Sequence, residues 1–386
     1  MKPFTHITAR FLALAMTLAP FAGCGAPTPP VRIGYFHGGR TQLLARIHND
    51  YEFAAAGVEV KMWSRDLNAE EFELMPHSIR EFNAPGTDIV GKVRGTELIE
   101  HLLRDEYDLT TPGESSFIMA MRQGLPVVAI AELGHDVRNQ SGHVIMMRNG
   151  MPADHPGDYF GQVLVSRRAG PGDSIMLKEY LERIGVNLEE DIVQLDALPR
   201  DVASKDLLPN DFIYIVDQLY EPQWAIGTHN CVIDGGYFHL MGVPAKIKKF
   251  WIVAALQDWV DPELSHALIV STPEYVAANR ERLIRLMETY ILRIKAEHAL
   301  SYEERTRRDE KGIQMAMDYY GLNLPQYDIV PTVSVELLTM MARLLRKYGF
   351  IEEEIDVASF VDNSLVLEAL ENLDISEEDD YWGSEF

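Results

Sequence analysis

The chain has 386 residues, of which 47% are hydrophobic, and this is enough apolar material for two domains with separate cores. Its formal charge is -24, and so acidic a protein is repelled by nucleic acid and by anionic membrane surfaces. No internal repeat is visible, which excludes a solenoid or a propeller. The two cysteines, Cys24 and Cys231, stand in different contexts. We therefore expect neither a disulfide nor a multi-cysteine metal site.

Residues 1–23 differ in character from the rest of the chain. Lys2 and Arg10 lie in a polar stretch that is followed by an almost wholly apolar run at 11–22. That run is too short for a stable membrane anchor but suits a signal peptide. The sequence Phe-Ala-Gly-Cys at 21–24 resembles a lipobox, which implies cleavage before Cys24 and acylation of its sulfur. The alternative is an ordinary secretory signal that is cleaved nearby.

The lipobox resemblance implies a location in the periplasm or on the outer face of a bacterial membrane. Residues 24–30 would then be the lipidated cysteine and a proline-rich tether that holds the folded body off the membrane. The membrane is thus an expected partner through the lipid anchor alone.

The first part of the body alternates between strand and helix patterns. Strands are predicted at 31–36 and 58–63, with a glycine-rich turn at 37–40 and a helix at 41–56 between them. Residues 68–91 have no clean period and are interpreted as a loop or insertion. The same pattern then continues with a helix at 95–107, a strand at 108–111, a helix at 114–123 and a strand at 126–132.

The strand pattern starts again at Gly142 and gives way to helices after residue 270. We expect strands at 143–147, 162–166, 191–195 and 212–216, and helices at 173–184, from Thr272 onward, at 302–320 and at 334–348. Strands that alternate with helices indicate mostly parallel sheets with helices on their faces. We therefore predict an α/β protein in which residues 31–140 and 266–371 form one lobe, 141–265 form a second, and 372–386 form an acidic, disordered tail.

Several segments, in this order, resemble the solute-binding proteins of ABC importers, and above all the group that serves nitrate, sulfonates, taurine and thiamine-pyrimidine precursors. They are Val-Arg-Ile-Gly-Tyr at 31–35, Gly-Glu-Ser-Ser at 113–116, Gln-Gly-Leu-Pro-Val-Val-Ala at 123–129, the stretch 211–222 and the stretch 269–276. The resemblance implies a two-lobed periplasmic-binding-protein fold of type II. It also implies a monomer without a cofactor that binds a small organic solute between its lobes and delivers it to an importer permease.

Ligands of parallel sheets bind at the carboxyl ends of the strands, where loops and helix N-termini meet. This rule selects four loops and the end of one strand. Each has a plainer interpretation: a tight turn, a helix cap, an exposed basic turn, or aromatic side chains that pack in a core. The candidate ligand-binding residues are Tyr35, His37, Gly38, Gly39 and Arg40, then Trp63, then Glu114, Ser115 and Ser116, then Arg167 and Ser174, and finally Asp217, Tyr220 and Glu221.

The chemistry of these candidates favours a flat or nitrogen-bearing solute. Glu114, Asp217 and Glu221 supply acceptors beside aromatic side chains, and a carboxylate at 114 would repel an oxyanion. The alternative is a sulfonate-like or other oxyanion held by Arg40 and Arg167.

No catalytic motif has the required spacing, so we predict binding without turnover and no metal site. Two alternatives remain: a ligand-sensing lipoprotein without transport, and an enzyme on the same fold. A binding protein also needs hinges, and the polar stretches at 134–142 and 262–266 are where we expect the lobes to close on a ligand.

Overall fold

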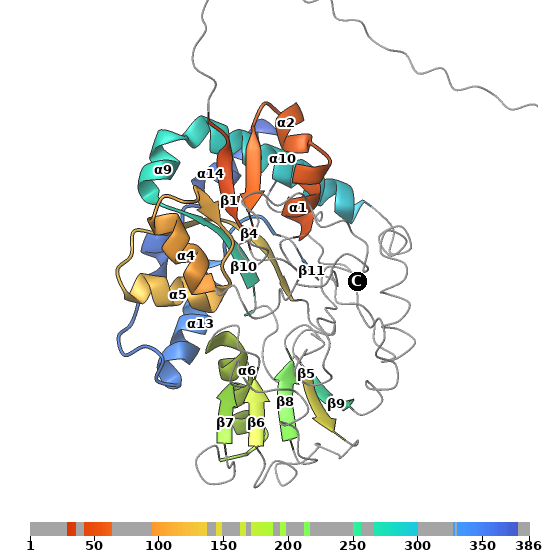
Figure 1. Cartoon of the computed structure of the whole chain (residues 1–386), viewed down its shortest axis with the longest axis vertical. Helices are drawn as coiled ribbons and strands as arrows, with labels where there is room; N and C mark the ends of the chain where they lie inside the picture. Colours follow the sequence, from red (N-terminus) through yellow and green to blue (C-terminus); the bar gives the residue numbers. More distant parts are fainter. Residues whose placement is uncertain are drawn as a thin grey trace, which may run out of the picture.

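The structure is a computed structural model that describes residues 29–35, 42–63, 95–136, 144–148, 163–166, 171–187, 194–197, 212–216, 250–255, 264, 266–299, 327–328 and 330–376. These residues form two β-sheets with helices packed around them (Figure 1). Within these ranges, no helix is long and apolar enough to cross a membrane. The predicted signal peptide, Cys24 and the tether up to residue 28, the stretch 68–91, the helix at 302–320 and the last ten residues of the predicted tail lie outside the described residues.

The first sheet has six strands among the described residues, in the order β11-β4-β10-β3-β1-β2. Strand β1 is parallel to β2 and β3, whereas β10 is antiparallel to both β3 and β4, and β11 is antiparallel to β4. The bounds are β1 Val31–Gly34, β2 Val60–Trp63, β3 Leu109–Thr110, β4 Val128–Asp136, β10 His266–Ser271 and β11 Tyr327–Asp328.

The second sheet is built wholly from chain that lies between β4 and β10, in the order β7-β6-β8-β5-β9. Strand β6 is parallel to β7 and β8, and β5 is antiparallel to β8 and β9. Strand β9 was not predicted, although its apolar run Phe-Trp-Ile-Val-Ala-Ala has the pattern of a buried strand. The bounds are β5 Val144–Arg148, β6 Val163–Ser166, β7 Gln194–Ala197, β8 Phe212–Val216 and β9 Phe250–Ala255.

Both sheets are mixed, yet one strand direction predominates in each. In the first sheet only β10 and β11 oppose the other described strands, and in the second only β5 does. The predicted α/β architecture with mostly parallel sheets is therefore confirmed. The exact bounds predicted for the two lobes stay a prediction.

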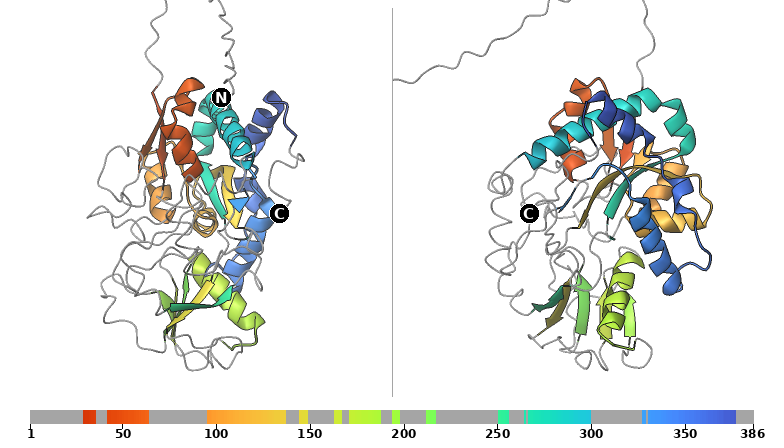
Figure 2. Two further views of the ribbon diagram at one scale, coloured as in Figure 1. Left: turned by 90° about the vertical axis from the view of Figure 1, so that its right-hand side faces the viewer. Right: turned by 180° about the vertical axis from the view of Figure 1, so that it is seen from behind.

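Helices cover both faces of the first sheet and create two apolar cores. Along β10, Ala267 and Ile269 face one core while Leu268 and Val270 face the other, as the two-residue period of a strand requires. Figure 2 shows the helices on either side of this sheet. The first core takes α1 Gln42–Asn49, α2 Glu52–Ala55, α10 Arg280–His298 and α14 Ser364–Asn372, and the second takes α4 Gly95–Leu103, α5 Glu114–Arg122, α6 Pro171–Arg183 and α13 Val335–Lys347.

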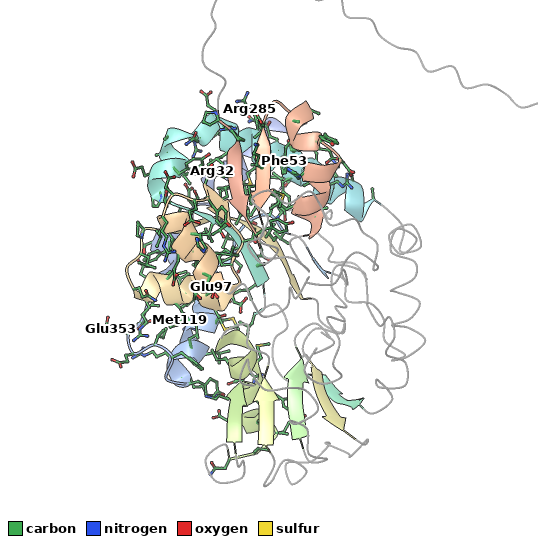
Figure 3. The ribbon with its side chains drawn as sticks, viewed as in Figure 1. Arg32, Phe53, Glu97, Met119, Arg285 and Glu353 are labelled. Carbon is green, nitrogen blue, oxygen red and sulfur yellow. The ribbon has the colours of Figure 1, made fainter. Side chains whose placement is uncertain are left out.

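The helix predicted at 41–56 is broken in the structure. Helix α1 ends at Asn49, and α2 begins at Glu52 after Tyr51, whose φ of 58° is left-handed. Asn49 and Asp50 favour turns because their short polar side chains compete with helical hydrogen bonds, which explains a break at this point. Phe53 of α2 still reaches the first core, where it is buried against the sheet (Figure 3).

The helix start predicted at Thr272 is confirmed. Thr272 Oγ1 accepts a hydrogen bond from the Tyr275 backbone N–H at 3.2 Å, and α9 Pro273–Ala278 begins with proline at its first position. The expected single long helix is interrupted at Asn279, where α9 ends and α10 begins. A short 3-10 helix, η8 Val357–Phe360, leads into α14.

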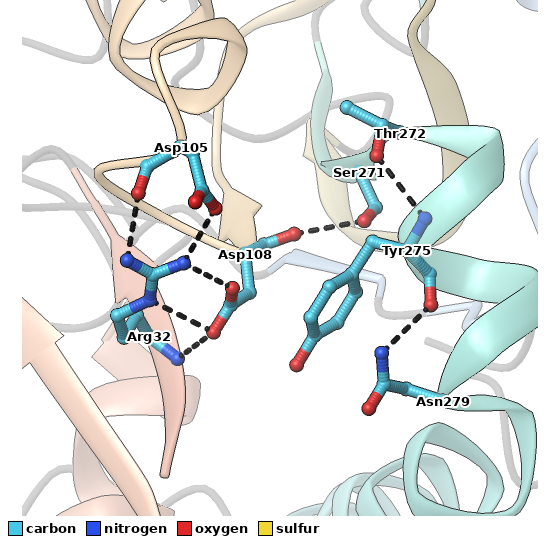
Figure 4. A network of polar contacts seen from close by, with 7 residues as sticks. All are labelled: Arg32, Asp105, Asp108, Ser271, Thr272, Tyr275 and Asn279. Atoms are coloured by element: carbon cyan, nitrogen blue, oxygen red, sulfur yellow. Dashed lines mark hydrogen bonds and ion pairs between the residues drawn. The ribbon is translucent and has the colours of Figure 1, made fainter. Parts of the chain in front are cut away.

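A polar network closes the first sheet at the amino ends of its parallel strands (Figure 4). The Asp108 carboxylate is 6% exposed and accepts hydrogen bonds from the Arg32 backbone N–H at 2.7 Å, from Nε at 3.2 Å and from a guanidinium nitrogen at 2.7 Å. Ser271 Oγ donates to the Asp108 backbone oxygen at 2.8 Å and so ties β10 to β3. Burial and then the Asp108 charge raise the pKa of neighbouring Tyr275 to about 12, so its phenol stays protonated.

We expect Arg32→Met to lower the free energy of unfolding by about 2 kcal/mol, because the buried Asp108 carboxylate loses its only cationic partner among the ion pairs of the described residues. Denaturant unfolding followed by circular dichroism measures the change. The matched control is Arg104→Met, which breaks an exposed pair with Glu100 at 3.5 Å and should cost less than about 0.5 kcal/mol. Equal losses in both variants would contradict the structural importance of this network.

Candidate functional site

The structure describes only part of the predicted binding set. His37, Gly38, Gly39, Arg40, Arg167, Asp217, Tyr220 and Glu221 lie outside the described residues, as does Cys24. Trp63 and Ser174 are placed by their backbone, at the end of β2 and in the first turn of α6. Tyr35, Glu114, Ser115 and Ser116 are described with their side chains.

Three of the predicted segments share one edge of the first sheet. Gly34, the last residue of β1, pairs with Trp63 of β2 and with Thr110 of β3, so the carboxyl ends of these parallel strands lie together. Tyr35 follows β1 directly, and Pro112 and Gly113 lead from β3 into α5. The rule that ligands bind at this edge therefore selects the start of α5.

The start of α5 is formed by small and polar residues that are almost fully buried. Gly113 is the N-cap residue, and because it has no side chain it makes no capping hydrogen bond. The helix itself begins at Glu114. Glu114, Ser115 and Ser116 are 6%, 6% and 5% exposed. A carboxylate in the first turn lies at the positive end of the helix dipole and is stabilised there.

The start of α6, which belongs to the second sheet by sequence, lies directly against the start of α5. A Cβ built on Gly172 would be 2.9 Å from Glu114 Oε1 and 3.1 Å from Ser115 Oγ. Gly172 therefore allows two helix N-termini, each from a different sheet, to touch. Helix α6 starts at Pro171, two residues before the predicted start at 173, because proline is favoured in a first helical turn.

The two neighbouring serines of α5 have different surroundings. Ser115 faces Gly172 of α6, whereas a Cβ on Gly95 of α4 would be 2.5 Å from Ser116 Oγ. Ser116 thus packs within the first half of the molecule, by which we mean the first sheet and the helices that connect its strands. Only Glu114 and Ser115 of the predicted trio lie at the contact between the two halves.

Tyr35 is a core residue as well as a neighbour of the site. It is 1% exposed and packs in the first core with Leu109 and Ile269. Burial raises the pKa of its phenol well above the usual range, so the hydroxyl is neutral at all ordinary pH values. The ring supports the carboxyl end of β1.

Gly172 lies at this contact but is not among the named candidates. Of its loop, which spans residues 167–174, the sequence prediction named only Arg167 and Ser174 as ligand-binding residues. The available clue was Pro-Gly-Asp-Ser at 171–174, in which proline starts the helix and glycine permits a close approach.

The arrangement sets two opposing electrostatic effects side by side. Backbone N–H groups at two helix N-termini favour an anion or a hydrogen-bond acceptor. The Glu114 carboxylate occupies part of that positive environment and lies beside Gly172 in the first turn of α6. The chain thus places an acidic side chain of its own where the two helix ends meet.

Comparisons with known proteins bear on the fold. No family model and no curated protein sequence matches the chain. Among solved structures, the chain is similar to the periplasmic aliphatic sulphonate binding protein SsuA from Escherichia coli, with a TM-score of 0.54, 14% identity and coverage of 87% of this chain and 92% of that one.

Two further structures extend the likeness. A putative periplasmic sulfonate-binding protein SsuA from Methylobacillus flagellatus KT gives a TM-score of 0.59 at 13% identity, with 90% of this chain and 96% of that chain covered. The periplasmic nitrate-binding protein NrtA from Synechocystis PCC 6803 gives 0.57 at 11% identity, with 92% and 91% covered. Identities this low show the fold alone. The chain therefore has the two-lobed fold of periplasmic binding proteins, as its sequence predicts.

Proposed function

We propose that the chain is an extracytoplasmic binding protein that holds a small solute between its two halves and delivers it to an ABC importer. The observation that carries this proposal is the contact of Gly172 with Glu114 and Ser115, because it brings the ligand-facing helix ends of both sheets to one place. The fold and the names of the similar structures support it. The chemistry is binding without turnover.

The solute we favour is a small organic molecule with a flat or nitrogen-bearing group. Glu114 is buried, and its carboxylate accepts hydrogen bonds from amines and N–H groups while it repels oxyanions. The sulfonate-binding and nitrate-binding names belong to the similar proteins, and Glu114 argues against transferring those solutes to this chain. Asp217, Tyr220 and Glu221 remain proposed contacts from the second half, and Arg40 and Arg167 remain the candidates for an oxyanion.

Two alternative functions, a ligand sensor and an enzyme, can be distinguished from this one. A sensor would present the same ligand to a membrane receptor, and a permease and an ATPase encoded beside the gene would favour transport over sensing. An enzyme on the same fold would consume its ligand, and prolonged incubation followed by mass spectrometry of the ligand would reveal turnover.

We expect Gly172→Ala to destabilise the protein by about 1–2 kcal/mol, because the new methyl group crowds Glu114 Oε1. Alanine would otherwise stabilise a helix by up to about 1 kcal/mol over glycine. In a Glu114→Ala background the shortest contact is removed and only Ser115 Oγ, at 3.1 Å, stays close, so the same change should cost less. Chemical unfolding of the four proteins gives this coupling, and an equal loss in both backgrounds would contradict the contact.

A thermal-shift screen of nitrogen heterocycles, amines, sulfonates and nitrate tests the solute class. A ligand at about 100 times its Kd adds about 2.7 kcal/mol of stability. We expect stabilisation by nitrogen-bearing compounds in the parent protein, and a loss of this effect in Glu114→Gln. The control is Glu352→Gln, which alters an exposed carboxylate on the loop after α13. Stabilisation by oxyanions alone would reverse our preference.

Lipid attachment at Cys24 has its own test. Cys24→Ser should abolish incorporation of labelled fatty acid and leave either a soluble form or an uncleaved precursor, because acylation needs the thiol. Labelled palmitate followed by electrophoresis measures the incorporation. Equal labelling of both proteins would show that the lipobox resemblance is misleading.

A further inference from the structure

Helix α6 belongs to the second sheet by sequence, yet its apolar face completes a core of the first. It connects β6 to β7 and contacts β6, β7 and β8. Ile175, Met176, Tyr180 and Leu181 are each at most 3% exposed and lie in one core with residues of α5 and α13. The two halves of the molecule therefore share a hydrophobic core through this helix.

A charged cluster at the edge of that core fastens α6 to the end of α13. We call Glu179, Glu182, Lys347 and Tyr348 the α6–α13 cluster. Lys347 Nζ lies 2.6 Å from Glu179 Oε2 and 2.7 Å from Glu182 Oε2. The Tyr348 hydroxyl lies 2.8 Å and 3.0 Å from oxygens of the same two carboxylates and shares its single proton between them. The last residue of α13 and its C-cap residue thus bind two carboxylates of α6.

Glu179 is the central member of the cluster because it is the most buried and has the most partners. Its side chain is 8% exposed, and Arg183 Nε donates to its second oxygen at 2.8 Å. Burial opposes ionisation, but hydrogen bonds from Lys347, Arg183 and Tyr348 outweigh it and lower the pKa of Glu179. The carboxylate is consequently charged and fully engaged at neutral pH.

Aromatic side chains enclose the cluster on the α13 side. Lys347 Nζ lies 4.8 Å from the Tyr348 ring centre, and Lys178 Nζ lies 5.2 Å from that of Phe350 and 5.6 Å from that of Tyr348. These cation–π contacts add to the attachment. Glu179 and Lys347 are separated by 168 residues in the chain, so the attachment is a long-range one.

We propose that α6 is the joint about which the two halves of the molecule turn, and that the α6–α13 cluster fixes this joint to the first half. The second sheet then moves against α6, while the contact of Gly172 with Glu114 and Ser115 persists in open and closed states. The turning rests on the proposed binding function, but the attachment of α6 does not. One wall of the binding site is accordingly fixed, and the moving wall is formed by other parts of the second half.

Native-state hydrogen exchange in increasing guanidinium, with the full mature chain and no ligand, tests the attachment. We expect the amides of α6 to open in the same cooperative unit as α5 and α13, with the same dependence on denaturant. Strands β6 and β8 should form a separate unit. Opening of α6 together with β6 and β8, ahead of α13, would overturn the proposal.

Single substitutions test whether the α6–α13 cluster is what holds α6 to the first half. Lys347→Met and Glu179→Gln should raise exchange of the α6 amides about tenfold or more, because each weakens the charge-assisted hydrogen bonds that the buried Glu179 carboxylate makes with α13. Exchange of α10, in the other core, should not change. The control is Arg346→Met, one residue from Lys347, which breaks only an exposed pair with Glu354 at 3.8 Å and should leave α6 unaffected.

Two outcomes would overturn the cluster's assignment. One is unchanged exchange in α6 for both variants, and the other is an equal increase in α6 and α10, which would indicate global destabilisation. If Lys347→Met does not fold, Tyr348→Phe removes one hydroxyl and keeps the ring, and it should still give faster exchange confined to α6. Loss of all ligand binding in the thermal-shift screen would defeat the proposed function and leave this result intact.

Discussion

The position of β10 constrains the whole structure. This strand is inserted between β3 and β4 and is antiparallel to both, so the first sheet stays incomplete until the chain has passed through every strand of the second. Its alternate residues enter the two cores, which join helices from both ends of the chain. Two crossovers must therefore lie side by side, one leaving β4 and one entering β10. A pair of adjacent crossovers is the simplest geometry that permits two halves to rotate without unfolding.

The second core also joins the two halves, because helices of the first half alone do not enclose it. Helices α4, α5 and α13 leave a surface that α6 covers with Ile175 and Met176. Burial of these side chains is worth roughly 2 kcal/mol each. The halves are thus joined by apolar burial as well as by two chain crossings, and the hinge has a packed support on one side. Under the proposed turning about α6, this packing would confine opening to the opposite side of the molecule.

Sequence patterns predicted the fold well where the signal was local. The strand at 212–216 has the predicted bounds, and the caps at Thr272 and Ser334 are made by the expected kind of residue. Prediction failed where the decisive interaction was distant or the pattern ambiguous. The break at Tyr51 interrupts a good helical period, and β9 is an apolar run without alternation. The contact between Gly172 and Glu114 joins residues from different sheets, so no window of sequence contains it.

Candidate site residues were predictable as a class, and their partners were not. The strand-end rule selected Glu114, Ser115 and Ser116 together, but it could not separate Ser115, which faces α6, from Ser116, which faces α4. That difference follows from the helical rotation of about 100° per residue and from which helix arrives on each side. The same reasoning explains why the fold of the protein does not determine which solute it binds. Paired helix ends favour an anion, whereas a carboxylate placed between them would disfavour one, so a single side chain can change the preferred solute while the fold stays the same.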